Sequence, residues 1–389
     1  MTKHRKDNRM KTIQNTITTR TDTATLGHPL EQCIFFDIET TGLSPRASSL
    51  YLIGSLIYNP KNSRWEMTQW FANTYRDEAA MILQFLETLE QYTYLYHFNG
   101  KTFDIPYILQ KCGKYHIELS EHNRSILQDT SGEYSIDLLT NIRPLKKKLG
   151  IPKAGQTDLE RWLGCVREDT YSGGDLIPVY SQYMQDRLLH PEHAEELEHF
   201  LLLHNHDDME GMLTVCRMLH YRHLFEVTPA LEQQLQVTEI KIHSSDEEAP
   251  SHIDIYFRHH AGLPKSVSVS TSYPVTKDAD CTWTLPEKCH LELDADTGCL
   301  HVQMVSAELK YFLPNPKDYY YLPSEDQAVH KSIASFVEPS HRKKATSATC
   351  YIRKQGIFLP SLLSHKEATE TNILQEVPAF AQTYRDKRC

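Results

Sequence analysis

Two carboxylates one residue apart, Asp37 and Glu39, are the residues whose types and spacing first suggest chemistry. They end an apolar run that begins at Cys33, and Thr40-Thr41-Gly42 follows them as a turn signal. Alternate residues of a strand point to the same face, so both carboxylates can converge on one point. Carboxylates that close repel each other, and a hard divalent cation is the usual remedy. The pair therefore predicts part of a metal site at the end of a strand.

A third carboxylate, Asp104, follows the segment Asn99-Gly100-Lys101-Thr102-Phe103. The pattern predicts a strand over 92–98 and a helix over 103–115, so Asp104 stands near a helix start, where the helix dipole favours negative charge. It also stands at the carboxyl end of a strand. Because ligand sites in such sheets lie beyond the carboxyl ends of the strands, we expect Asp104 beside the first two carboxylates.

The third motif, His204 to Asp208, lies on the longest predicted helix, residues 192–225. His204 and Asp208 are four residues apart and share one helical face. Together they offer a metal ligand and an imidazole that can take a proton from water near neutral pH. Asp207 points about 100° away around the helix, and we expect it to be solvated.

These three motifs resemble those of the ribonuclease H-like DEDD 3′–5′ exonuclease superfamily. The second continues as Phe103-Asp104-Ile105-Pro106-Tyr107, as in the proofreading domains of family-B DNA polymerases. The closer similarity is to the bacterial ribonuclease H-like proteins typified by YprB, and it covers residues 32–225. It includes Ile136-Asp137-Leu138-Leu139, Leu159-Glu160-Arg161-Trp162-Leu163-Gly164, Ile177-Pro178-Val179-Tyr180 and His204-Asn205.

The resemblance implies an exonuclease that acts on single-stranded ends of DNA or RNA with two Mg²⁺ or Mn²⁺ ions. Asp37, Glu39 and Asp208 would hold one ion, and Asp37 and Asp104 the other. Two such cations can activate water and stabilise the leaving oxygen of a phosphodiester. His204 would be the general base, although histidine members of the superfamily usually place it five residues before the last aspartate. Here the gap is four, which is the tyrosine position of the tyrosine subgroup.

Residues that flank the carboxylates are secondary candidates for substrate contacts, namely Thr40, Asn99, Lys101 and Phe103. For Asp137, a structural role at a strand end is favoured over a part in the site. Two other functions stay open: a nucleic-acid-binding adaptor with little turnover, and a structure-selective endonuclease that uses the same site.

The elements that must position these residues predict an α/β fold: a ribonuclease H-like mixed five-stranded sheet flanked by helices, followed by a β-rich C-terminal region. We expect a disordered tail over 1–30, an exonuclease domain over 31–228, and a β-rich region of unknown role over 229–389. The predicted strands are 34–38, 51–58, 65–71, 92–98 and 135–139.

The bulk composition limits the partners. A net charge of -10 in 389 residues does not suit a protein that coats nucleic acid by charge alone. No apolar run approaches the length of a membrane span, so no membrane partner is expected. Nine cysteines without a CxxC pair argue against a zinc knuckle and favour a cytoplasmic location.

A tyrosine-rich segment, 319–321, precedes a predicted helix over 326–337 and a basic cluster over 340–354. Aromatic and basic side chains together can stack bases and pair with phosphates. Core tyrosines beside a solvated loop are the favoured alternative.

Overall fold

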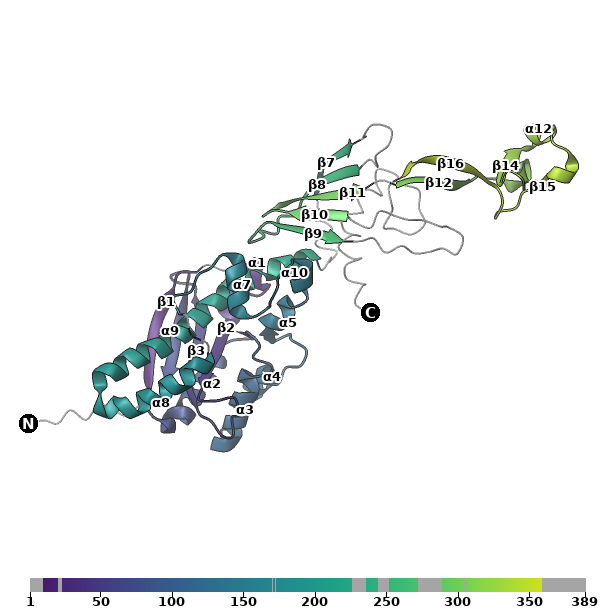
Figure 1. The fold of residues 1–389 in the computed structure, drawn as a ribbon. Coiled ribbons are helices and arrows are strands. Elements are labelled where there is room, and N and C mark those ends of the chain that lie inside the picture. The colour runs from purple at the N-terminus through teal and green to yellow at the C-terminus, as the bar shows by residue number, and fades with distance from the viewer. Residues whose placement is uncertain are drawn as a thin grey trace, which may run out of the picture. The chain divides into compact units, whose positions relative to one another are not determined.

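The computed structural model describes residues 10–19, 23–169, 171, 173–225, 236–243, 252–271, 289–303 and 305–358 (Figure 1). The chain forms two compact units. The first comprises residues 1–224 with 261–265, and the second comprises residues 225–260 with 266–389. Within the described ranges, no helix has both the length and the apolar character needed to cross a membrane.

The first unit is built on a six-stranded mixed sheet with the strand order β1-β4-β3-β2-β5-β6. Strands β2, β3, β4 and β1 pair antiparallel, whereas β5 and β6 run parallel to β2. This sheet confirms the predicted mixed α/β fold. The strands are β1 (Lys11–Ile17), β2 (Cys33–Thr40), β3 (Leu50–Asn59), β4 (Arg64–Phe71), β5 (Tyr94–His97) and β6 (Ser135–Asp137).

Strand β1 corrects the expectation of a disordered tail over residues 1–30. It pairs with β4 from Lys11 opposite Phe71 to Ile17 opposite Trp65, and it adds a sixth strand to the predicted five. Most of its side chains are exposed, and only Ile17 is buried. Backbone hydrogen bonds to β4 therefore hold this edge strand, which is why its polar composition gave no signal of order.

Helices cover both faces of the sheet. α2 (Glu78–Leu89) packs Phe85 against Phe36 of β2, with ring centroids 5.0 Å apart. α9 (Pro191–Cys216) lies on the other face of β2 and β3, where Asn205 reaches Asp37. The remaining helices of this unit are α1 (Thr23–Leu26), α3 (Asp104–Tyr115), α4 (Glu121–Leu127), α5 (Leu138–Ile142), α6 (Leu145–Lys148), α7 (Gln156–Leu163), α8 (Gly173–Leu189) and α10 (Leu219–Phe225). The predicted single helix over 192–225 is thus two helices, α9 and α10.

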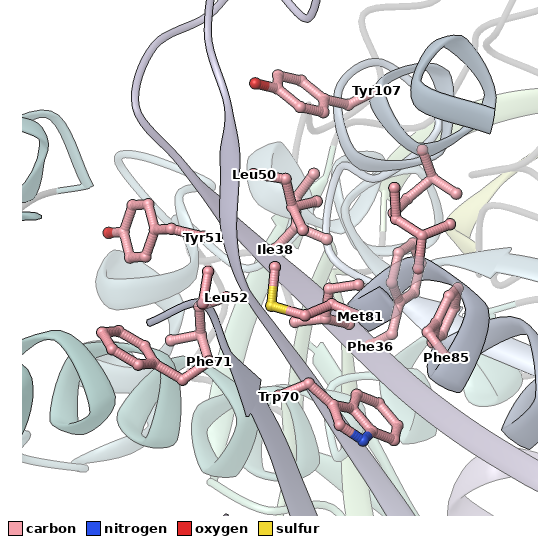
Figure 2. Packing of buried hydrophobic residues seen from close by; sticks show 14 of the residues in the cluster. Phe36, Ile38, Leu50, Tyr51, Leu52, Trp70, Phe71, Met81, Phe85 and Tyr107 are labelled. Carbon is pink, nitrogen blue, oxygen red and sulfur yellow. The ribbon is translucent and has the colours of Figure 1, made fainter. Parts of the chain in front are cut away.

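The core fixes the direction of the side chains on β2. Phe36 and Ile38 lie in the apolar cluster with Met81 and Phe85, and Figure 2 shows them from close by. Since alternate residues of a strand point to opposite faces, Asp37 and Glu39 must point away from this cluster.

The second unit is rich in β-structure, as predicted. A five-stranded antiparallel sheet has the order β7-β8-β11-β10-β9, and a two-stranded ribbon and a three-stranded sheet accompany it. The strands are β7 (Gln236–His243), β8 (His252–Arg258), β9 (Val267–Thr271), β10 (Cys289–Leu293), β11 (Thr297–Gln303), β12 (Val305–Phe312), β13 (Tyr319–Leu322), β14 (Gln327–His330), β15 (Lys343–Lys344) and β16 (Tyr351–Phe358).

The predicted helix over 326–337 is wrong. Residues Gln327–His330 form β14, which pairs with β13, and only α12 (Lys331–Ala334) is helical. Asp326 has a φ of 50°, a turn conformation outside the helical region, and β14 follows it directly. Pairing with the tyrosine-rich β13 therefore prevails over the local helical spacing.

Candidate metal and catalytic site

Asp37 is held by a close contact between β3 and α9. It lies opposite Gly54 in the β2–β3 pair, and its Oδ2 accepts a hydrogen bond from Asn205 Nδ2 at 2.9 Å. Gln69 Nε2 donates to Asn205 Oδ1 at 3.1 Å, which fixes the orientation of that amide. Only a glycine fits at position 54 beneath the Asn205 amide. A Cβ there would lie 2.9 Å from Asn205 Nδ2 and closer still to Asn205 Oδ1.

Asp104 meets the same strand from the start of α3. Its Oδ1 accepts a hydrogen bond from the Ile38 backbone N–H at 3.3 Å, so this buried carboxylate lies alongside the strand residues that carry Asp37 and Glu39. The preceding loop is held by Asp137, whose carboxylate accepts the backbone N–H groups of Asn99 at 3.1 Å and Lys101 at 3.4 Å. Asp137 therefore has the structural role that the sequence favours.

His204 joins two of the predicted carboxylates. Its Nε2 lies 3.6 Å from Glu39 Oε1 and 3.4 Å from Asp208 Oδ2, and these three residues each place a ligand atom within 4.8 Å of the others. Its Nδ1 lies 2.6 Å from Asp169 Oδ2. The imidazole is thus held from behind by Asp169 and faces the carboxylates with Nε2.

Arg167 supplies a positive charge at the edge of this cluster. Its Nη1 lies 2.5 Å from Asp208 Oδ1, while Nε and Nη2 pair with the two Glu160 oxygens at 2.5 and 2.7 Å. The bidentate pair with Glu160 fixes the guanidinium, so Arg167 in turn orients Asp208.

The carboxylates raise one another's proton affinity. Burial first, and then the charges of Asp104 and Asp208, raise the pKa of Asp37 well above its usual range. Burial and the charges of Asp37 and Asp208 do the same to the pKa of Glu39. Burial raises the pKa of Asp104 to about 7. This pattern marks a buried cluster of like charges, which a cation would stabilise.

The structure gives most of the secondary candidates local partners. Thr40 Oγ1 donates to the Gly42 carbonyl at 3.0 Å, and Asn99 Oδ1 accepts from the Thr102 hydroxyl at 2.9 Å. Phe103 packs against the apolar core. None of these side chains is joined to the carboxylates by a described contact, and Lys101 is half-buried.

Sequence reasoning missed Arg167 and Asp169, and it misjudged Asp207. The two missed residues lie in the loop between α7 and α8, which has no periodic pattern that could point to them. Asp207 was expected in solvent, but its Oδ2 accepts the backbone N–H groups of Glu168 at 3.1 Å and Asp169 at 2.9 Å. It therefore anchors the loop that carries both missed residues.

The sheet and its helices define a ribonuclease H-like α/β domain. Residues 34–220 match the model of the RNase_H superfamily. The closer similarity to YprB-type proteins stays a prediction from the sequence. A search of the curated proteins finds no match.

Several solved structures share parts of this arrangement. The family B DNA polymerase of Pyrobaculum calidifontis is 17% identical over 51% of this chain and 25% of its own, with a TM-score of 0.36. Exonuclease I of E. coli in complex with a dT13 oligonucleotide is 11% identical over 59% of this chain and 55% of its own, with a TM-score of 0.30. Exonuclease I of Methylocaldum szegediense is 14% identical over 92% and 70%, with a TM-score of 0.28. The chain spans a quarter of the polymerase and about half of the E. coli enzyme, and similarities at these scores carry no functional argument.

Proposed function

We propose that this chain hydrolyses phosphodiester bonds in nucleic acid, as a cytoplasmic 3′→5′ exonuclease on single-stranded ends. The supporting observation is the convergence of Asp37, Glu39, Asp104 and Asp208 from β2, α3 and α9 on one buried cluster. The match of residues 34–220 to the RNase_H superfamily model supports the nuclease class, whereas polarity and single-strand preference rest on the sequence resemblance.

The donor set fits divalent cations. Carboxylate oxygens are the ligands that Mg²⁺ and Mn²⁺ prefer. Asp37, Glu39 and Asp208 would hold one ion, and Asp37 with Asp104 would hold a second. When bound, such a pair of ions supplies electrostatic stabilisation of the attacking and leaving oxygens.

His204 has the geometry of a proton acceptor. When Asp169 accepts the proton of Nδ1–H, the lone pair of the neutral imidazole is on Nε2, the atom that faces Glu39 and Asp208. We assign His204 as the general base that orients and deprotonates water, and Asp169 as the residue that positions it.

The test uses the full chain with end-labelled DNA and RNA oligonucleotides of matched sequence, in Mn²⁺ or in EDTA. We expect single nucleotides from the 3′ end with Mn²⁺, no products with EDTA, and no products from Asp37→Asn. Asp158→Asn, which removes the partner of Arg161 one turn away on α7 and lies outside the cluster, is the matched control and should keep full activity.

Three results would overturn parts of the proposal. Full activity of Asp37→Asn would show that the assigned centre does not catalyse the reaction. Cleavage of circular single-stranded DNA, which offers no end, indicates an endonuclease. Oligonucleotide binding without any Mn²⁺-dependent product indicates an adaptor.

A further inference from the structure

The second unit contains the five-stranded sheet β7-β8-β11-β10-β9 (Figure 1). Its strands alternate apolar and polar residues, so the sheet has one apolar and one polar face. Ile253, Ile255 and Leu300 are buried on the apolar face. The residues that alternate with them carry nitrogen, sulfur and oxygen donors. These are His243 on β7, His252 and Asp254 on β8, His290 and Glu292 on β10, and Cys299 and His301 on β11.

Strand register brings several of these donors to Asp254. His301 lies directly opposite Asp254 in the β8–β11 pair, and Cys299 is two residues before His301 on the same face. His301 Nδ1 is 2.7 Å from Asp254 Oδ1 and 4.0 Å from Cys299 Sγ. The ligand atoms of Asp254, Cys299 and His301 all lie within 4.8 Å of one another.

We propose that Asp254, Cys299 and His301 bind one divalent transition-metal ion of the zinc class. Ligands at 2.0–2.3 Å from such an ion form a tetrahedron with edges of roughly 3.3–3.7 Å. The two distances above, 2.7 Å and 4.0 Å, fall on either side of that range. Sulfur and imidazole donors select zinc-class ions over Mg²⁺, and solvent would complete the coordination.

The neighbouring residues support the ligands as they do in known metal sites. A ligating histidine usually presents its second nitrogen to a carboxylate, and His301 Nε2 lies 3.6 Å from Glu292 Oε2. The second oxygen of Asp254 is engaged by His243 Nε2 at 2.9 Å. Asp254 is only 6% exposed, so its carboxylate is fixed between these partners.

A second set, His243, His252 and Asp254, shares the same carboxylate. Its two histidine rings stack with centroids 4.3 Å apart, but their side chains are 43% and 48% exposed. The set with Cys299 is the more buried and has a carboxylate behind its histidine. For this reason we assign the ion to Cys299 and His301.

Cobalt(II) distinguishes the two sets, because only the Cys299 set can give a thiolate-to-cobalt charge-transfer band in the near ultraviolet. The full chain, titrated with Co²⁺ alone, should develop visible d–d bands of tetrahedral Co²⁺ and this charge-transfer band, and the charge-transfer band should saturate at one equivalent of cysteine-bound Co²⁺ per chain. Zn²⁺ should then remove both. Asp37→Asn should behave like the wild type, which separates this ion from the nuclease centre in the first unit.

Variants complete the test. Cys299→Ser should abolish the charge-transfer band, and His301→Ala should weaken Co²⁺ binding at least tenfold. His341→Ala, which removes an exposed histidine outside both sets, is the matched control and should retain wild-type spectra. The proposal is overturned if wild-type protein gives no Co²⁺ bands, or if Cys299→Ser keeps them while His252→Ala loses them. Circular dichroism should confirm that each variant retains the β-structure.

Discussion

The contact between Gly54 and Asn205 makes a quantitative prediction for Gly54→Ala. Asn205 is fully buried, and its amide is fixed by hydrogen bonds to Asp37 and from Gln69. A Cβ at residue 54 would lie 2.9 Å from Nδ2 and 3.0 Å from Cγ of Asn205. The amide cannot swing into solvent, so either α9 must move away from the sheet or the hydrogen bonds must break.

The magnitude follows from those two responses. Overpacking a core costs about 1–3 kcal/mol, and a buried polar group left without its partner costs about 1–3 kcal/mol. Because either response has this cost, we expect Gly54→Ala to lower the free energy of unfolding by about 1–3 kcal/mol. Because Asn205 orients a proposed metal ligand, we also expect nuclease activity to fall by about 10–100-fold.

Denaturant unfolding followed by the fluorescence of Trp65 and Trp70, which lie on β4 beside β3, measures the stability. Gly113→Ala is the matched control. Gly113 is exposed on α3 with nothing within 4 Å of its added Cβ, so alanine there should be neutral or stabilising by up to about 1 kcal/mol. If Gly54→Ala is within about 0.5 kcal/mol of the wild type and fully active, the reasoning about this packing is refuted.

Three further changes test the cluster itself. Arg167→Met should lower activity by about 10–100-fold, because Asp208 loses the guanidinium that orients it; unchanged activity would mean that Asp208 is positioned without it. Asp169→Asn should lower activity by about 10–100-fold, because the carboxylate that holds His204 Nδ1 is lost; unchanged activity would mean that Asp169 does not position His204. Asp104→Asn should stabilise the metal-free protein near pH 8 and have little effect near pH 4. Burial raises the pKa of Asp104 to about 7, so the folded state binds more protons than the unfolded state and loses stability as pH rises through that range. Equal effects at both pH values in urea unfolding would contradict this.

Local sequence patterns were sufficient to predict the sheet and the positions of the site residues that lie on strands and helices. The strand over 34–38 and the helix over 192–225 place Asp37, Glu39, His204 and Asp208 by periodicity alone, and the structure has β2 and α9 there. Such placement works because strand and helix periods are fixed by backbone geometry.

The positions of the remaining residues depend on tertiary structure, so local sequence patterns could not predict them. β1 has few buried side chains and is ordered by its pairing with β4, which no local pattern reports. Arg167 and Asp169 reach α9 from an irregular loop, about forty residues away along the chain, because Asp207 anchors that loop. Asp254 and His301 are far apart in sequence and meet only through strand register.

The charge balance of the cluster explains why a doubly charged partner suits it. The guanidinium of Arg167 is shared between Asp208 and Glu160, so the Arg167–Glu160 pair adds no net charge. Asn205 and the Ile38 backbone donate to the cluster without adding charge. Raising the pKa of a buried carboxyl from 3.8 to about 7, as for Asp104, disfavours its ionised form by roughly 4 kcal/mol. Cation binding must offset that cost. Divalent ions neutralise such carboxylates with half as many positions as monovalent ions need in the same small volume. The electrostatics that destabilises the metal-free fold therefore favours divalent over monovalent ions.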